Sequence, residues 1–106
     1  MDMNMDEMTK HLMLVASSTD NYCKYLNEDY NKYATILGYV YRIHQDKIRQ
    51  VSPQGLALIL IFLKDVKEED YEKYIDKYKD KVDEIISTSK TIDEQLEKMK
   101  ELKDSI

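Results

Sequence analysis

Apolar residues recur every three or four positions through much of this chain, a spacing that places them on one side of an α-helix. The first such series is Met5, Met8, Leu12 and Val15. It predicts a short, methionine-rich helix over residues 5–16 with one buried face. The segment 17–20, Ser-Ser-Thr-Asp, is rich in residues that cap helix N-termini, so we expect a break and a new helix there.

A second series continues from Tyr22 to Ile48 and predicts one amphipathic helix of unusual length. Its apolar members are Tyr22, Tyr25, Leu26, Tyr33, Ile36, Leu37, Val40 and Ile43. Glycine costs about 1 kcal/mol in a helix interior and is often found where a helix bends. We therefore expect a kink near Gly38.

The segment from Leu56 to Leu63 is apolar on every side, which indicates an element surrounded by the rest of the protein. A buried strand would have the same composition, but the chain offers no second strand to pair with it. Ser52 supplies a capping hydroxyl, and Pro53 has a preset φ and no amide hydrogen. These features predict a central helix that begins at Pro53.

The remaining chain predicts two more helices, over about 67–88 and 92–105. Each is preceded by a pair of residues typical of a capping box, Asp65 with Glu68 and Thr91 with Glu94. The buried face of the first of these helices should consist of Tyr71, Ile75, Tyr78, Val82 and Ile85, and that of the second of Ile92, Leu96, Met99, Leu102 and Ile106. We therefore expect one all-α domain over residues 1–106, a compact bundle of four to five mostly antiparallel helices with a central apolar helix.

Composition narrows the class of function. The net charge is −5, and residues 68–106 contain thirteen acids and eight lysines. Lysine outnumbers arginine fourteen to two, which disfavours nucleic-acid binding because arginine is the residue most used for bidentate recognition of phosphates and bases. Cys23 is the only cysteine, the N-terminus is acidic, and no apolar run approaches the length of a membrane span. These features predict a cytoplasmic protein without a membrane segment.

The helix expected over 67–88 has a distinctive surface, because its acids and lysines are largely segregated on neighbouring flanks. The acidic flank consists of Glu72, Asp76, Asp80 and Asp83. It is either a contact surface for a partner or a solvated face of the bundle. A helix with segregated flanks can also pair with its own copy, so a homodimer is a further possibility.

Two tyrosines are candidates for contact with a partner. The chain has nine tyrosines, one phenylalanine and no tryptophan, and tyrosine suits interfaces because its ring is apolar and its hydroxyl is polar. Tyr39 and Tyr41 lie just off the apolar stripe of the second helix, on opposite edges. We include both in the candidate protein-binding surface.

The only basic cluster lies close to these tyrosines and consists of Arg42, His44, Lys47 and Arg49. Basic residues interleaved with aromatic ones can bind nucleic-acid backbones and bases. His44 and Lys47 also project toward the apolar stripe, as Asp29 does, where they would form a polar layer between helices. The cluster is therefore an alternative nucleic-acid site or a structural feature.

Catalysis and metal binding find no support in the sequence. His11, His44 and Cys23 show no paired spacing of the kind zinc sites use. Neither Ser17, Ser18 nor Cys23 is accompanied by a glycine-rich elbow. We therefore expect no enzyme activity, no cofactor and no metal.

The preferred hypothesis is a small non-catalytic protein that regulates or inhibits a partner protein by binding it. One alternative is an accessory factor that binds nucleic acid through the basic cluster. Another is an immunity-type protein, because that class also includes helical bundles of this size. This last likeness concerns architecture alone.

Overall fold

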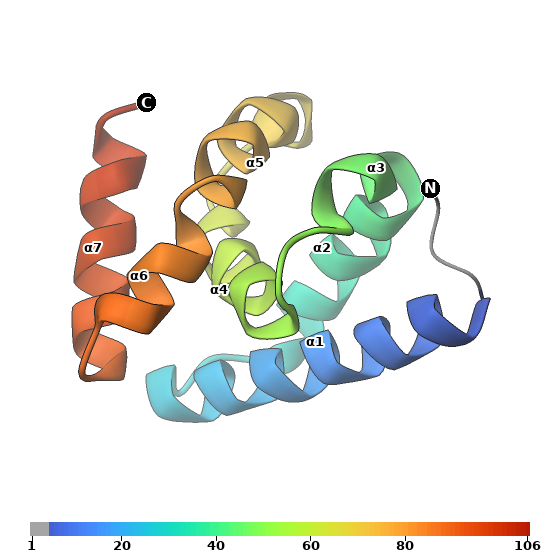
Figure 1. Cartoon of the computed structure of the whole chain (residues 1–106), viewed down its shortest axis with the longest axis horizontal. Coiled ribbons are helices and arrows are strands. Elements are labelled where there is room, and N and C mark those ends of the chain that lie inside the picture. The colour runs from blue at the N-terminus through green and yellow to red at the C-terminus, as the bar shows by residue number, and fades with distance from the viewer. Residues whose placement is uncertain (1–4) are drawn as a thin grey trace.

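The computed structural model describes residues 5–106, and these residues form seven α-helices and one 3-10 turn (Figure 1). The helices are Met5–Leu26 (α1), Tyr30–Ile43 (α2), Gln45–Ile48 (α3), Pro53–Leu63 (α4), Tyr71–Lys79 (α5), Val82–Thr88 (α6) and Ile92–Asp104 (α7), and the 3-10 turn η1 is Glu68–Asp70. The radius of gyration is 12.8 Å, close to the roughly 13 Å expected for a single domain of this length. The prediction of one all-helical bundle is confirmed.

Helix α4 occupies the centre of the bundle, with α1 along one side and α7 along another (Figure 1). Its residues 55–60 and Leu63 are buried, and α1, α2, α5, α6 and α7 all contact it. It begins at Pro53, and the Ser52 hydroxyl accepts a hydrogen bond from the Gly55 amide at 2.9 Å. The predicted central helix and its first residue are therefore confirmed.

A long-range contact completes the start of α4. The Ser52 hydroxyl donates to one carboxylate oxygen of Asp83 at 2.5 Å, and the Ser52 amide donates to the other at 3.3 Å. A carboxylate at a helix N-terminus is favoured by the partial positive charge there. Asp83 belongs to α6, so this contact joins the centre of the bundle to its C-terminal half.

Helix α1 does not break at residues 17–20, so the prediction of two helices there is wrong. Thr19 is fully buried, and its hydroxyl donates to the carbonyl of Val15 at 2.7 Å. This bond within the helix satisfies the hydroxyl, so a residue that often caps helices can occupy a helix interior. Capping residues therefore permit a break without requiring one.

The chain breaks instead at Asn27, where φ is 57°. Asparagine tolerates this left-handed conformation better than most residues. The Glu28 amide donates to the Cys23 carbonyl at 2.9 Å, the bond that closes a Schellman motif at the end of α1. Asp29 then caps α2 through the Asn31 amide at 3.0 Å. The helix predicted from Tyr22 to Ile48 is thus divided before its middle.

Gly38 is not where the chain turns. Helix α2 continues through Gly38 as far as Ile43, and the next interruption is His44, between α2 and α3. Gly38 is exposed, and nothing lies within 4 Å of the Cβ that an alanine would add there. The kink expected at this glycine is replaced by the turn at Asn27.

The helix predicted over 67–88 is also divided. Asp80 and Lys81 separate α5 from α6, although no glycine or proline lies there. The capping box expected at Asp65 and Glu68 does not form, because no side-chain bond caps η1 or α5. The box at Thr91 does form, since the Thr91 hydroxyl accepts from the Glu94 amide at 3.1 Å and the Glu94 carboxylate accepts from the Lys90 amide.

Most of the predicted core is buried, but several positions are not. Four of the five residues expected to form the buried face of α5 and α6 are buried, and Ile85 is partly buried. Leu12, Tyr25 and Ile43 were expected in the core and are 38%, 50% and 52% exposed. Ile106 is also exposed, and the side chain of Met5 lies outside the described residues. Across residues 5–106, no helix has both the length and the apolar character needed to cross a bilayer.

The two glycines should respond in opposite ways to alanine. Gly38→Ala should raise the free energy of unfolding by about 0.5–1 kcal/mol, because the added methyl group meets nothing and the unfolded chain loses freedom. At Gly55 the added Cβ would lie 2.5 Å from the Asp83 carboxylate and 3.0 Å from the Ser52 hydroxyl. Gly55→Ala should therefore lower the free energy of unfolding by about 1–3 kcal/mol.

Urea unfolding followed by circular dichroism measures both changes. Gly55→Ala in an Asp83→Ala background is the control, because removing the carboxylate should remove most of the added cost. Equal effects of the two glycine substitutions would contradict the packing described at Gly55.

Candidate functional site

The sequence-predicted acidic flank and basic cluster meet on one surface, formed by α3 and α5. The Lys47 ammonium lies 2.9 Å from a carboxylate oxygen of Asp76 and 3.4 Å from one of Glu72. The Lys79 ammonium lies 3.6 Å from the same oxygen of Asp76. A hollow of about 340 Å³ lies beside these contacts, and Lys47, Lys79, Asp80 and Arg49 all line it. We call this mixed-charge surface the α3–α5 face.

Charges on the α3–α5 face compensate one another. The hydrogen bond from Lys47 is the main cause that lowers the pKa of Asp76, and the same bond raises the pKa of Lys47. Both groups are therefore charged, and the attraction between Asp76 and Lys47 is complete, at any pH between the ordinary Asp pKa of 3.8 and the ordinary Lys pKa of 10.5. It is lost as the pH falls through the lowered pKa of Asp76 or rises through the raised pKa of Lys47.

Tyr39 is packed at the edge of this face. Its ring meets the Tyr71 ring edge-on at a centroid distance of 5.5 Å, and the Arg42 guanidinium lies 5.8 Å from its centroid. His44 is buried, with its ring 6.1 Å from that of Tyr39. Arg42 is thus the exposed member of this group, whereas His44 is mainly part of the packing.

Tyr41 and Asp83 lie away from the α3–α5 face and have structural bonds. The Tyr41 hydroxyl donates to Nδ1 of His11, and Nε2 of His11 donates to the Val51 carbonyl at 3.1 Å. Burial raises the pKa of Tyr41 to about 12. Asp83 binds Ser52 at the start of α4. Contact of these two residues with a partner stays a prediction.

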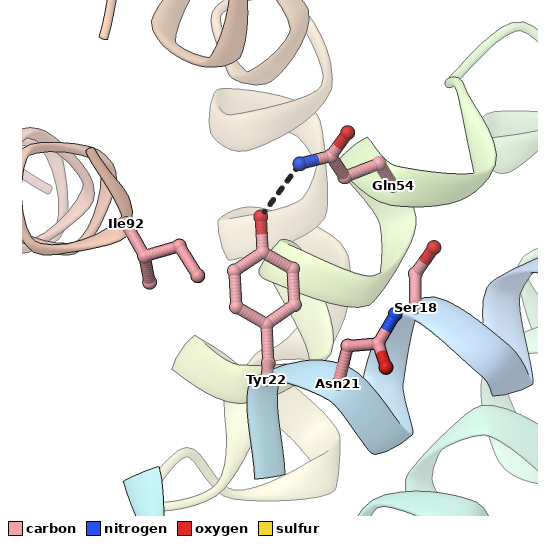
Figure 2. A pocket seen from close by; sticks show the side chains of 5 residues that line it. All are labelled: Ser18, Asn21, Tyr22, Gln54 and Ile92. Carbon is pink, nitrogen blue, oxygen red and sulfur yellow. Dashed lines mark hydrogen bonds between the residues drawn. The ribbon is translucent and has the colours of Figure 1, made fainter. Parts of the chain in front are cut away.

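A second site, missed by the sequence analysis, is a pocket of about 260 Å³ between α1, α4 and α7. Figure 2 shows its lining side chains, which are Ser18, Asn21, Tyr22, Gln54 and Ile92. None of them is charged, although 35% of the residues in the chain are. Three other hollows on the described chain all include lysine and carboxylate side chains. We call this one the uncharged pocket.

Hydrogen bonds fix the wall of the uncharged pocket. The Gln54 side-chain amide donates to the Tyr22 hydroxyl at 3.2 Å, as Figure 2 shows, and that hydroxyl donates to the side-chain oxygen of Gln95 at 2.5 Å. Burial raises the pKa of Tyr22, partly offset by the bond from Gln54. One tyrosine thus connects α1, α4 and α7, and the pocket is built on rigid elements.

The pocket opens beside a strip of uncharged residues on α1. Leu14, Ser18, Asn21 and Tyr25 are spaced by four, three and four positions, which places them on one face of the helix. Leu14 is 49% exposed, and Tyr25 is half-exposed with its hydroxyl donating to Asp93 of α7 at 2.6 Å. We call these four residues the α1 strip.

The predicted helix break concealed the α1 strip in the sequence. A break at residues 17–20 places Leu14 and Tyr25 on different helices, so their common face cannot be recognised. The available signal was the absence of charge at four helically spaced positions in a highly charged chain.

Two features of the described residues bear on metal binding and on the reactivity of the thiol. Within residues 5–106, no group of three His, Cys, Asp or Glu side chains is placed to hold a metal ion. Cys23 is buried, and its pKa is raised by burial and by the nearby carboxylates of Asp20, Glu28 and Asp29. A buried thiol with a raised pKa is a poor nucleophile.

The Tyr22 hydrogen bonds predict a specific loss of stability. Tyr22→Phe leaves the buried Gln95 oxygen without its donor, so the free energy of unfolding should fall by about 1–3 kcal/mol. Tyr25→Phe is the matched control, because its bond to Asp93 is exposed and water can replace it. Thermal unfolding of both variants measures the two losses of stability. A larger loss for Tyr25→Phe than for Tyr22→Phe would contradict the prediction.

The contact between Lys47 and Asp76 predicts how the pKa of Asp76 depends on Lys47. The pKa of Asp76 should lie below its ordinary value in the native protein and rise toward it in Lys47→Met. Carbon-detected NMR of the side-chain carboxyl groups measures both values. Lys77→Met is the control, because Lys77 is an exposed residue of α5 and the ion pairs of Asp76 are with Lys47 and Lys79. A pKa of Asp76 that Lys47→Met leaves unchanged would contradict the contact.

Comparison of this chain with protein-family models, with curated proteins and with solved structures finds no match. No relative therefore assigns a role to the α3–α5 face, the uncharged pocket or the α1 strip. We therefore infer a function from the side chains of these surfaces.

Proposed function

We propose that this protein is a non-catalytic module that binds another protein through the α1 strip and the uncharged pocket. The observation that carries the proposal is the half-exposed Leu14 and Tyr25 on either side of a pocket without charged side chains. The centres of protein–protein interfaces are depleted in charge and enriched in tyrosine. The partner surface should therefore be uncharged where it meets the pocket.

The side chains of the pocket suit a protein ligand. The Asn21 and Gln54 amides each provide hydrogen-bond donors and an acceptor, and both residues are exposed. They can pair with peptide groups or with neutral side chains of a partner. Leu14 and Ile92 offer apolar contact beside them. Exposed apolar residues next to a concave polar site are typical of binding surfaces.

The nucleic-acid alternative has weaker support. Binding to a phosphate backbone depends on uncompensated positive charge. On the α3–α5 face Lys47 lies between two carboxylates, and His44 is buried. Regulation or inhibition of a partner protein, including the kind expected of an immunity-type protein, requires only that this chain covers a surface of that partner.

Affinity capture from the native host tests the proposal. Tagged wild-type protein and a Leu14→Glu, Asn21→Arg variant are incubated with lysate, with and without nuclease, and proteins present in stoichiometric amount are identified. Both positions are exposed, so the variant should keep its unfolding temperature. Its affinity for the purified partner should fall by more than about tenfold, because charges would be buried unpaired in the interface.

A Glu72→Arg, Asp80→Arg variant is the matched control on the α3–α5 face, and it should bind the partner as the wild type does. Loss of the partner in this control alone would locate binding on the acidic flank and refute the role of the α1 strip. Recovery that depends on nucleic acid would favour the nucleic-acid alternative. Light scattering that shows a dimer disrupted by the α1 variant would identify the partner as a second copy of the chain.

A further inference from the structure

A second pocket, of about 290 Å³, lies at the opposite end of α4 from the uncharged pocket. It is lined by Glu28, Tyr33, Ile61, Phe62, Lys64, Asp65, Lys100, Lys103 and Asp104. These residues come from α2 and the turn before it, from the end of α4 and the two residues that follow it, and from the last turns of α7. We call it the Tyr33 pocket. None of its residues belongs to the α3–α5 face or to the α1 strip.

The Tyr33 hydroxyl lacks a hydrogen-bond partner. Tyr33 is 1% exposed, and no donor or acceptor of the described residues reaches its hydroxyl oxygen. Burial raises its pKa, and the charges of Lys64, Glu28 and Asp65 act on it. All three of these residues line the Tyr33 pocket together with Tyr33 itself, so the buried hydroxyl lies close to the pocket wall. Buried polar groups usually have partners, so an unpaired one beside a pocket points to a ligand atom.

The charged side chains of the pocket are balanced but largely unpaired. Lys64 binds Glu28 at 2.8 Å. The other four charges are Lys100, Lys103, Asp65 and Asp104, and within residues 5–106 none of them forms an ion pair or a side-chain hydrogen bond. Two positive and two negative charges thus remain available to a ligand. A simple acid or a simple amine would leave one sign unmatched and would be repelled by it.

Part of the wall is apolar. Ile61 and Phe62 are partly buried residues near the end of α4, and both line the pocket. Pockets that bind small molecules commonly combine such an apolar wall with a few polar groups that fix orientation. The apolar wall accommodates a hydrocarbon side chain.

We propose that the Tyr33 pocket binds a small zwitterion, a free amino acid with an apolar side chain. Its carboxylate accepts hydrogen bonds from the Tyr33 hydroxyl and from Lys100 or Lys103. Its ammonium group lies near Asp65 or Asp104, and its side chain packs on Ile61 and Phe62. Because the hydroxyl has almost no contact with solvent, binding includes a shift of side chains in the pocket wall.

Titration calorimetry with the full chain tests the ligand class. The probes are leucine, phenylalanine, 4-methylpentanoate (leucine without its ammonium group) and isopentylamine (leucine without its carboxylate). At least one amino acid should bind with 1:1 stoichiometry, and the two leucine derivatives should bind at least about tenfold more weakly. Equal binding of either derivative, or no binding of any probe at about 10 mM, would overturn the proposal.

Two tyrosine variants provide a matched comparison. Tyr33 and Tyr78 both have buried hydroxyls without partners, but Tyr78 does not line this pocket. Neither Tyr33→Phe nor Tyr78→Phe should lower the unfolding temperature, because each removes only an unsatisfied group. Tyr33→Phe should weaken amino-acid binding about tenfold, whereas Tyr78→Phe should leave it unchanged. Unchanged binding in Tyr33→Phe would show that the hydroxyl is no ligand group and would overturn the proposal.

Discussion

The complete burial of α4 is the constraint on which the rest of this structure depends. A helix that is apolar on every side must be enclosed, and each fully buried large apolar side chain contributes about 1.5–3 kcal/mol. Five other helices contact α4 for this reason. Its first turn still needs polar partners, and Ser52 with Asp83 supplies them. The position of α6 is thereby connected to the start of the central helix.

Both pockets follow from this arrangement. The uncharged pocket lies where the start of α4 meets α1 and α7, and the Tyr33 pocket lies where its end meets α2 and α7. An eleven-residue helix is about 16 Å long, so the two pockets are separated by roughly the length of α4. Helices that surround a central helix contact one another less closely at its ends, and side chains there enclose small hollows.

The distribution of charge distinguishes the surfaces. On the α3–α5 face lysines and carboxylates neutralise one another at short range. The acidic flank and the basic cluster, which the sequence suggests as two separate binding sites, therefore form one surface with balanced charge. On the α1 strip no charge is present to be compensated. In the Tyr33 pocket Lys64 pairs with Glu28, whereas among the described residues no ion pair is formed by the other charged side chains of the wall, Lys100, Lys103, Asp65 and Asp104. These differences underlie the assignment of a protein partner to one site and a small zwitterion to another.

The sequence by itself determined the all-helical bundle, the central helix from Pro53, and the buried face of α5 with Val82 of α6, because periodicity and capping act locally. Of the face predicted over residues 92–106, Met99 is buried, three residues are partly buried and Ile106 is exposed. The points where helices stop could not be read from these patterns. Thr19 satisfies its hydroxyl within α1, Asn27 adopts the left-handed turn, and the chain divides at Asp80 without a glycine or proline. Tertiary structure alone decided which residues meet, since Lys47 and Asp76, or Tyr22 and Gln95, are far apart in sequence. The sites depend on these long-range meetings, which no local pattern encodes.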